Sequence, residues 1–258
     1  MPLFNEKSLI EDYFVEQLQV RSEKRWRFVG GDELERESTE EPLLTTAFIR
    51  ALKSLNRDVG IGDDEVKQVI NELKLRGSGS EDSKKILNYF KDGVPIKFEK
   101  ERVVKYVKLF NYDDFTKNDF VVSRQITHQA GDKQIRNDII LYINGIPLVN
   151  IECKNPASLT ETWYSAFMQI LGYERDVPEL YKYIQLGVAS DNKAKYFPTT
   201  PWQQDGEPRY YEWRDGGKDS IDSTIRMLMP DTLLNIIRNY LFIRVERGAT
   251  TKVLTRYM

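Results

Sequence analysis

The chain has 258 residues, of which 40% are hydrophobic and 12% aromatic, enough apolar surface to build a core and to exclude wholesale disorder. Its 38 Lys and Arg residues nearly cancel its 40 Asp and Glu residues, and a net charge of −2 argues against a protein that holds nucleic acid by bulk electrostatic attraction. One cysteine and one histidine exclude disulfide scaffolds, cysteine zinc sites and multi-histidine sites, so any metal would need the oxygen ligands that Mg²⁺ or Mn²⁺ prefers.

The hydrophobic pattern predicts that residues 1–92 are helical. Apolar residues recur at helical spacing in four segments, around residues 8–18, 44–55, 66–73 and 86–90. The stretch Ser8–Glu11 has the spacing of an N-terminal capping box, and Gly93 is expected to end the last helix. Residues 22–41 are charged and aperiodic, which predicts a loop.

After residue 93 the period of the pattern changes from that of a helix to that of a strand. Strands are expected around residues 96–109, 120–122, 138–142, 147–154 and 183–189, and helices at 159–174 and 231–242. No stretch reaches the roughly 18–20 apolar residues of a membrane span. Glu6 and Lys7 precede any apolar run, so we expect a cytoplasmic protein without a secretory signal and without membrane contact.

The stretch Arg136–Pro156 contains two apolar strands around an Asn-Gly turn, with charged residues at their ends. Alternate residues of a strand share a face, so Glu152 and Lys154 point the same way, and Asp138 comes from the neighbouring strand. A divalent cation bound by Asp138, Glu152 and the main-chain carbonyl of Cys153 would compensate two adjacent carboxylates. Lys154 would then orient a water molecule or stabilise the attacked phosphorus. On spacing alone, an ordinary surface Glu–Lys pair is an equal alternative.

A second motif favours the metal site. Gln169 and Tyr173 are four residues apart in the helix that follows, so they share a face. Together with Glu152-x-Lys154 they resemble the Q-x-x-x-Y extension of the RecB-like branch of the PD-(D/E)xK nucleases. The run from Gln125 to Leu180 resembles, more specifically, the nuclease domain of the endonuclease (R) subunit of type I restriction enzymes.

The family's motifs have clear counterparts in the chain. The family carries R-P-D-I-V-L-F-I-N-G-L-P-L-V-x-I-E-x-K-N-P, then Q-I-x-x-Y, then D-I-P-E-L-F. The matching residues are 136–156, 169–173 and 176–181. Asn137 replaces the proline that names the superfamily, and Tyr181 stands at the last phenylalanine. Because the proline shapes the backbone and does not ligate metal, its replacement puts little in doubt.

The resemblance implies a role for each matching residue. Asp138 and Glu152 would be metal ligands with the Cys153 carbonyl, Lys154 the catalytic lysine, and Gln169 and Tyr173 supporting residues of the nuclease motif.

Two further residues are weaker candidates. Related nucleases place a carboxylate on the first helix, for which Glu11 is the nearest candidate, although we favour the capping-box interpretation of this residue. Arg136, with Arg124 and Lys133, would approach a phosphate backbone.

The resemblance also implies a fold and a function. The fold is expected to be α/β, a mixed β-sheet flanked by helices with a restriction-endonuclease-like core, preceded by an N-terminal helical region. The expected boundaries are residues 1–92 for that region, 93–245 for the nuclease core, and 246–258 for the start of a linker to helicase-like motor domains. The function would be Mg²⁺-dependent (or Mn²⁺-dependent) hydrolysis of DNA, coupled to ATP through the motor domains, with the modification and specificity subunits as partners.

Two alternatives remain open at this point. One is a non-catalytic domain that docks DNA or partner subunits, against which the intact Asp138, Glu152 and Lys154 count. The other is a free-standing repair nuclease of the same superfamily. The Gly216–Lys218 run lacks the flanking residues of a phosphate-binding loop, so no ATP site is expected in this chain. His128 is expected at the surface and Cys153 in the core.

The hairpin poses a geometric test. A two-residue turn at Asn144-Gly145 would place Asp138 opposite Ile151, and Glu152 would then point to the other face of the sheet. A shared metal ion requires both carboxylates on one face. We therefore expect one extra residue, as a bulge or a three-residue turn with Gly145 at positive φ, so that Asp138 pairs with Glu152.

Overall fold

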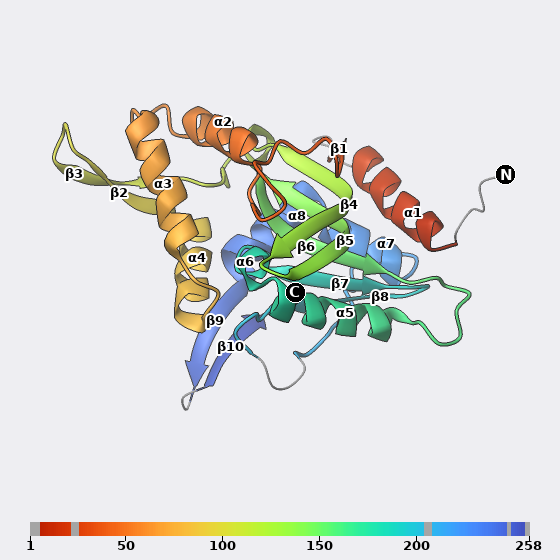
Figure 1. Cartoon of the computed structure of the whole chain (residues 1–258). Coiled ribbons are helices and arrows are strands. Elements are labelled where there is room, and N and C mark those ends of the chain that lie inside the picture. Colours follow the sequence, from red (N-terminus) through yellow and green to blue (C-terminus); the bar gives the residue numbers. More distant parts are fainter. Residues whose placement is uncertain (1–5, 22–25, 204–207, 247–248, 256–258) are drawn as a thin grey trace.

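A six-stranded sheet forms the centre of the molecule (Figure 1). The computed structural model describes residues 6–21, 26–203, 208–246 and 249–255. The strand order is β1-β4-β5-β6-β7-β8. The strands are β1 (Arg27–Gly30), β4 (Phe120–Ala130), β5 (Lys133–Ile143), β6 (Ile146–Cys153), β7 (Leu186–Ser190) and β8 (Ala194–Pro198). Because β1 pairs with β4 and β6 with β7 in parallel, while the other pairs are antiparallel, the sheet is mixed. The expected α/β class is confirmed.

Helices cover both faces of this sheet (Figure 1). They are α1 (Glu6–Val20), α2 (Thr45–Leu55), α3 (Asp63–Leu75), α4 (Ser80–Asp92), α5 (Trp163–Asp176), α6 (Pro178–Tyr181), α7 (Ser220–Met227) and α8 (Pro230–Asn235), with short helical turns η1 (Phe115–Lys117) and η2 (Ile236–Tyr240). One hydrophobic cluster joins one face of the sheet to α1–α4, α7 and α8, and the other joins the opposite face to α5 and α6. No helix among the described residues combines the length and hydropathy needed to span a bilayer.

Two two-stranded ribbons stand apart from the central sheet. β2 (Val94–Phe98) pairs with β3 (Val103–Val107), and β9 (Leu241–Glu246) pairs with β10 (Ala249–Leu254). Both ribbons project from the body of the molecule in Figure 1. The strand pattern expected over residues 96–109 is therefore correct in type, but it builds a ribbon of its own.

Three local expectations are wrong. Residues 27–30, expected in a loop, form β1 and extend the sheet by pairing with β4, so the N-terminal region is not purely helical. The helix expected over residues 231–242 breaks into α8 and the π-helical η2, and β9 begins at Leu241. Ser8 lies inside α1 and does not precede it, so it cannot cap the helix. The domain boundaries themselves remain a prediction.

The expected bulge is present in the β5–β6 hairpin. Asn144 and Gly145 form a two-residue turn with φ of 53° and 79°, and Ile143 pairs with Ile146. Further along, Leu141 pairs with Val149, so Leu148 is the extra residue on β6. The extra residue is therefore correctly expected, and Gly145 does have positive φ, but the bulge lies three residues beyond the turn.

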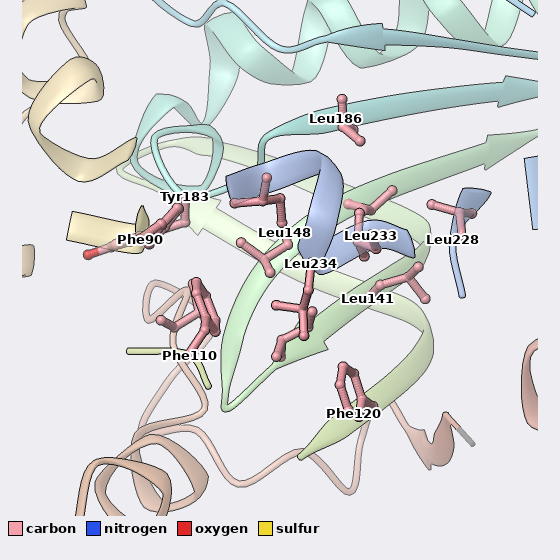
Figure 2. Close-up of a cluster of buried hydrophobic side chains, with 14 of the residues drawn as sticks. Phe90, Phe110, Phe120, Leu141, Leu148, Tyr183, Leu186, Leu228, Leu233 and Leu234 are labelled. Carbon is pink, nitrogen blue, oxygen red and sulfur yellow. The ribbon is translucent and has the colours of Figure 1, made fainter. Parts of the chain in front are cut away.

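The extra residue, Leu148, packs into the core. Its side chain is fully buried in the larger cluster. Figure 2 draws it with Leu234 of α8 and other buried aromatic and leucine side chains of the same cluster. Burying a leucine contributes roughly 1.5–3 kcal/mol, so this packing stabilises the bulged strand.

The turn itself is pressed against the start of α2. The Leu44 N–H donates to the Gly145 carbonyl at 2.9 Å. A Cβ atom at Gly145 would lie 2.7 Å from the Leu44 oxygen and 2.8 Å from the Phe48 nitrogen. Only glycine accommodates both the positive φ and this close approach.

We predict that Gly145→Ala destabilises the protein far more than Gly131→Ala. Gly131, in the β4–β5 turn, also has positive φ (59°), but its Cβ would meet nothing within 4 Å. The control should cost about 1–2 kcal/mol for the left-handed backbone, and Gly145→Ala roughly 2 kcal/mol more because rigid backbone atoms block the methyl group. Urea unfolding measures both, and equal losses would contradict the close packing of the turn.

Candidate active site

The carboxylates of Asp138 and Glu152 meet on the α5 face of the sheet. Because of the bulge, Ile139 pairs with Ile151, and one further step along the strands sets Asp138 beside Glu152. The Asp138 N–H donates to Glu152 Oε1 at 3.1 Å, and the Cys153 N–H donates to Asp138 Oδ2 at 2.9 Å. Each carboxylate thus accepts a main-chain N–H from the other strand. The exposed fractions are only 3% for Asp138 and 0% for Glu152.

Lys154, Gln169 and Tyr173 form one bonded chain beside this pair. Lys154 Nζ donates to Gln169 Oε1 at 2.6 Å, and Gln169 Nε2 donates to Glu152 Oε2 at 2.9 Å. The same Nε2 lies 2.6 Å from the Tyr173 hydroxyl, which donates to the Arg136 carbonyl at 3.0 Å. Gln169 therefore links the lysine to the carboxylate, and Tyr173 fixes Gln169 to β5. The shared helix face expected for the Q-x-x-x-Y motif is confirmed.

Glu11 also lies next to the site, which corrects the capping-box interpretation. Its carboxylate is buried and accepts hydrogen bonds from Gln125 Nε2 at 2.8 Å and Arg124 Nη2 at 3.2 Å. Gln125 Nε2 is 3.5 Å from Asp138 Oδ1 as well, so this amide stands between two carboxylates. Arg124 forms a second ion pair with Asp12. The guanidinium expected to approach a phosphate is thus held against α1.

The donor set of the site fits a hard divalent cation. Burying two adjacent carboxylates costs free energy unless hydrogen-bond donors and a cation compensate. A carboxylate offers about four acceptor positions, so N–H bonds and metal ligation are compatible. Within the described part of the chain, no cluster of three or more His, Cys, Asp or Glu side chains is arranged to hold a metal. An ion between Asp138 and Glu152 would therefore complete its shell with main-chain oxygen, such as that of Cys153, and with water.

Comparisons with known proteins agree with this geometry. Residues 4–206 match the family model described as the N terminus of the type I restriction enzyme R protein. The chain belongs to this family. It is 32% identical over 241 residues to the putative type I restriction enzyme MjaVIIIP endonuclease subunit of Methanocaldococcus jannaschii, covering 90% of this chain and 23% of that subunit. It is 31% identical over 186 residues to the type I restriction enzyme HindI endonuclease subunit of Haemophilus influenzae, covering 65% of this chain and 17% of that subunit.

The family relationship covers only part of each longer relative. The aligned region spans about a quarter or less of these two endonuclease subunits. The family match over residues 4–206 includes all five residues of the bonded site: Asp138, Glu152, Lys154, Gln169 and Tyr173.

His128 is not the surface residue that the sequence suggested. It is 1% exposed, and its Nδ1 lies 3.1 Å from Asn137 Oδ1. Burial, with a further contribution from the charge of Arg36, lowers the pKa of the His128 ring to about 3. Cys153 is buried as expected, and the Arg136 side chain is exposed at the edge of the site.

Sequence reasoning missed Gln125, although a signal for it exists. Ala130 pairs with Lys133 around the Gly131-Asp132 turn, and counting back along the regular hairpin places Gln125 opposite Asp138. The backbone there is unusual, because Gln125 has φ of 55°. A non-glycine residue in this region carries a conformational cost of about 1–3 kcal/mol and often marks a functional site.

We predict that the ring of His128 stays neutral in the folded protein down to about pH 4. Its folded pKa of about 3 lies below the unfolded value of about 6.5. Below pH 6.5 the histidine of the unfolded chain is protonated, whereas that of the folded chain stays neutral. The free energy of unfolding therefore decreases as the pH drops, by at most about 1.4 kcal/mol per pH unit. Nitrogen NMR of the single histidine tests this, with the urea-unfolded chain as control. A folded-state midpoint between pH 6 and 7 would contradict the buried position.

Proposed function

We propose that this chain is the nuclease domain of a type I restriction endonuclease subunit and hydrolyses DNA phosphodiester bonds. The observation that carries the proposal is the reciprocal bonding of Asp138 and Glu152 on one face of the sheet, with Lys154 held beside them through Gln169. Two carboxylates and a lysine in this arrangement suit phosphodiester hydrolysis with a divalent cation, Mg²⁺ or Mn²⁺.

Each residue of the site has a separate role in this proposal. Asp138 and Glu152, with the Cys153 carbonyl, would hold the cation, which when bound supplies positive charge and an acidified water. Lys154 presents its ammonium group toward the reacting phosphate and stabilises negative charge there. Gln169 limits the positions available to that ammonium group, because its amide is bonded to both Lys154 and Glu152. Such fixed donors need little reorganisation during reaction.

Glu11 and Gln125 would form the other wall of the site. Gln125 lies within hydrogen-bonding distance of Glu11 at 2.8 Å and of Asp138 at 3.5 Å. The Glu11 carboxylate, separated from Asp138 by the Gln125 side chain, would accept a hydrogen bond from a water molecule on the cation or supply a further oxygen ligand. Arg124 keeps Glu11 in place through their ion pair. Arg136, exposed beside the site, would contact the DNA backbone.

The wider activity is proposed from the family. In this proposal the longer subunit couples cleavage to ATP-driven translocation by its motor domains, and modification and specificity subunits are its partners. The near-neutral charge of this chain agrees with such a division, since a domain of net charge −2 would rely on partners to be brought to DNA.

We predict that Glu152→Ala abolishes Mn²⁺ binding. The substitution removes one of the two carboxylates that the proposal assigns to the ion. Glu161→Ala is the matched control, because Glu161 is an exposed carboxylate in the loop before α5. Isothermal titration calorimetry should show binding to the unsubstituted chain and to the control, and none to Glu152→Ala. Undiminished binding by a folded Glu152→Ala variant would remove the proposed site.

A further inference from the structure

Three buried polar side chains are hydrogen-bonded to one another close to Asp138 and Glu152. They come from β5 (Asn137), β6 (Asn150) and α6 (Tyr181), and none is more than 1% exposed. Asn150 Nδ2 donates to the Tyr181 hydroxyl at 2.7 Å, and Asn137 Nδ2 donates to the same hydroxyl at 3.3 Å. Asn137 Oδ1 is in turn 3.1 Å from His128 Nδ1. We call the first three residues the Asn–Tyr–Asn bridge.

The bridge lies near the end of the β5–β6 pairing, where β6 still pairs with β7 at Glu152. The β5–β6 pairing ends at Ile139 and Ile151, and the β4–β5 pairing is interrupted at Asp138. Asn137 precedes Asp138 directly, while Asn150 lies two residues before Glu152 and so shares its face. The Tyr181 hydroxyl accepts a hydrogen bond from both Asn137 and Asn150 and so links β5 to β6.

Keeping these polar side chains in the core costs free energy, so their presence there needs an explanation. Asn150 Oδ1 is buried and has no hydrogen-bond partner among the described residues. Leaving a buried amide oxygen unpaired costs about 1–3 kcal/mol. An apolar residue at this position of a fully buried strand would avoid the cost. The motif supports the same view, because Asn137 stands at its proline and Tyr181 at its last phenylalanine, and neither of those side chains could form the bridge.

We propose that Asn137, Asn150 and Tyr181 are positioning residues that hold Asp138 and Glu152 at the separation a divalent cation requires, an inference that rests on the proposed function. The bridge takes over the role of the missing proline: a side-chain linkage fixes the approach of β5 to β6 where the motif uses a rigid backbone. The Tyr181 phenol remains protonated, because burial first, and then the negative charges of Glu152 and Glu174, raise its pKa well above the usual value.

The test compares two buried tyrosines. Tyr181→Phe removes the centre of the bridge, whereas Tyr183→Phe removes one buried hydroxyl that donates to the Leu73 carbonyl at 3.2 Å, away from the carboxylates. Both side chains are 1% exposed, so both variants should lower the thermal unfolding midpoint, Tyr181→Phe by more because it leaves two buried amides without their acceptor. Calorimetry with Mn²⁺ should show affinity weakened about tenfold in Tyr181→Phe and unchanged in Tyr183→Phe.

A double-mutant cycle adds a readout that general destabilisation would not produce. Asn137→Ala and Tyr181→Phe break the same linkage, so the double variant should lose little more Mn²⁺ affinity than the worse single variant. Additive losses, or full affinity in a folded Tyr181→Phe, would overturn the positioning role while leaving the proposed function intact. If the unsubstituted chain itself bound no Mn²⁺, the proposed function would fail, and the positioning role with it.

Discussion

The site depends on one extra residue in β6. If Leu148 took part in a regular ladder instead of forming the bulge, the tight turn at Asn144-Gly145 would set Asp138 opposite Ile151, and the two carboxylates would lie on opposite faces of the sheet. With the bulge, the Asp138 N–H reaches Glu152 and the Cys153 N–H reaches Asp138. The bulge is stabilised on the far face, where Leu148 is buried in the larger core. Packing on one side of the sheet thus sets the chemistry on the other.

Helix α5 completes the site because it packs on the face of the sheet that carries the carboxylates, with polar side chains directed toward them. Its buried side chains Phe167 and Ile170 anchor the helix in the smaller cluster. Gln169 and Tyr173 then reach Lys154, Glu152 and the edge of β5. A displacement of α5 would therefore move the lysine and loosen the carboxylate together, so the position of this helix and the chemistry of the site are coupled.

The sequence predicts the parts of the molecule that have strong local patterns. The long apolar strands around Asn144-Gly145 and the Gln169–Tyr173 spacing are of this kind, and the requirement of a shared ion predicts the extra residue in the hairpin. Its location at Leu148 depends on a core assembled from distant segments, which no local pattern records. β1 has only four residues, and its pairing with β4 joins segments about ninety positions apart.

Local sequence patterns gave wrong predictions where contacts with other elements determine the environment of a side chain. Ser8–Glu11 fits a capping box, but Glu11 is bonded to Arg124 and Gln125 from a strand more than a hundred residues away. His128 is polar and therefore expected at the surface, whereas it is buried and its partner Asn137 lies on the other strand of the same hairpin. In each case a side chain that a single element would leave exposed is buried by a neighbour that the pattern of its own segment does not reveal.

The central proposal is that Asp138 and Glu152 together bind a divalent cation. A crystal of the chain soaked in Mn²⁺, with diffraction data collected at a wavelength where manganese scatters anomalously, tests it most directly. We predict an anomalous peak about 2.0–2.6 Å from a carboxylate oxygen of each residue. A peak elsewhere, or an absence of any peak while both carboxylates remain beside each other, would contradict the account.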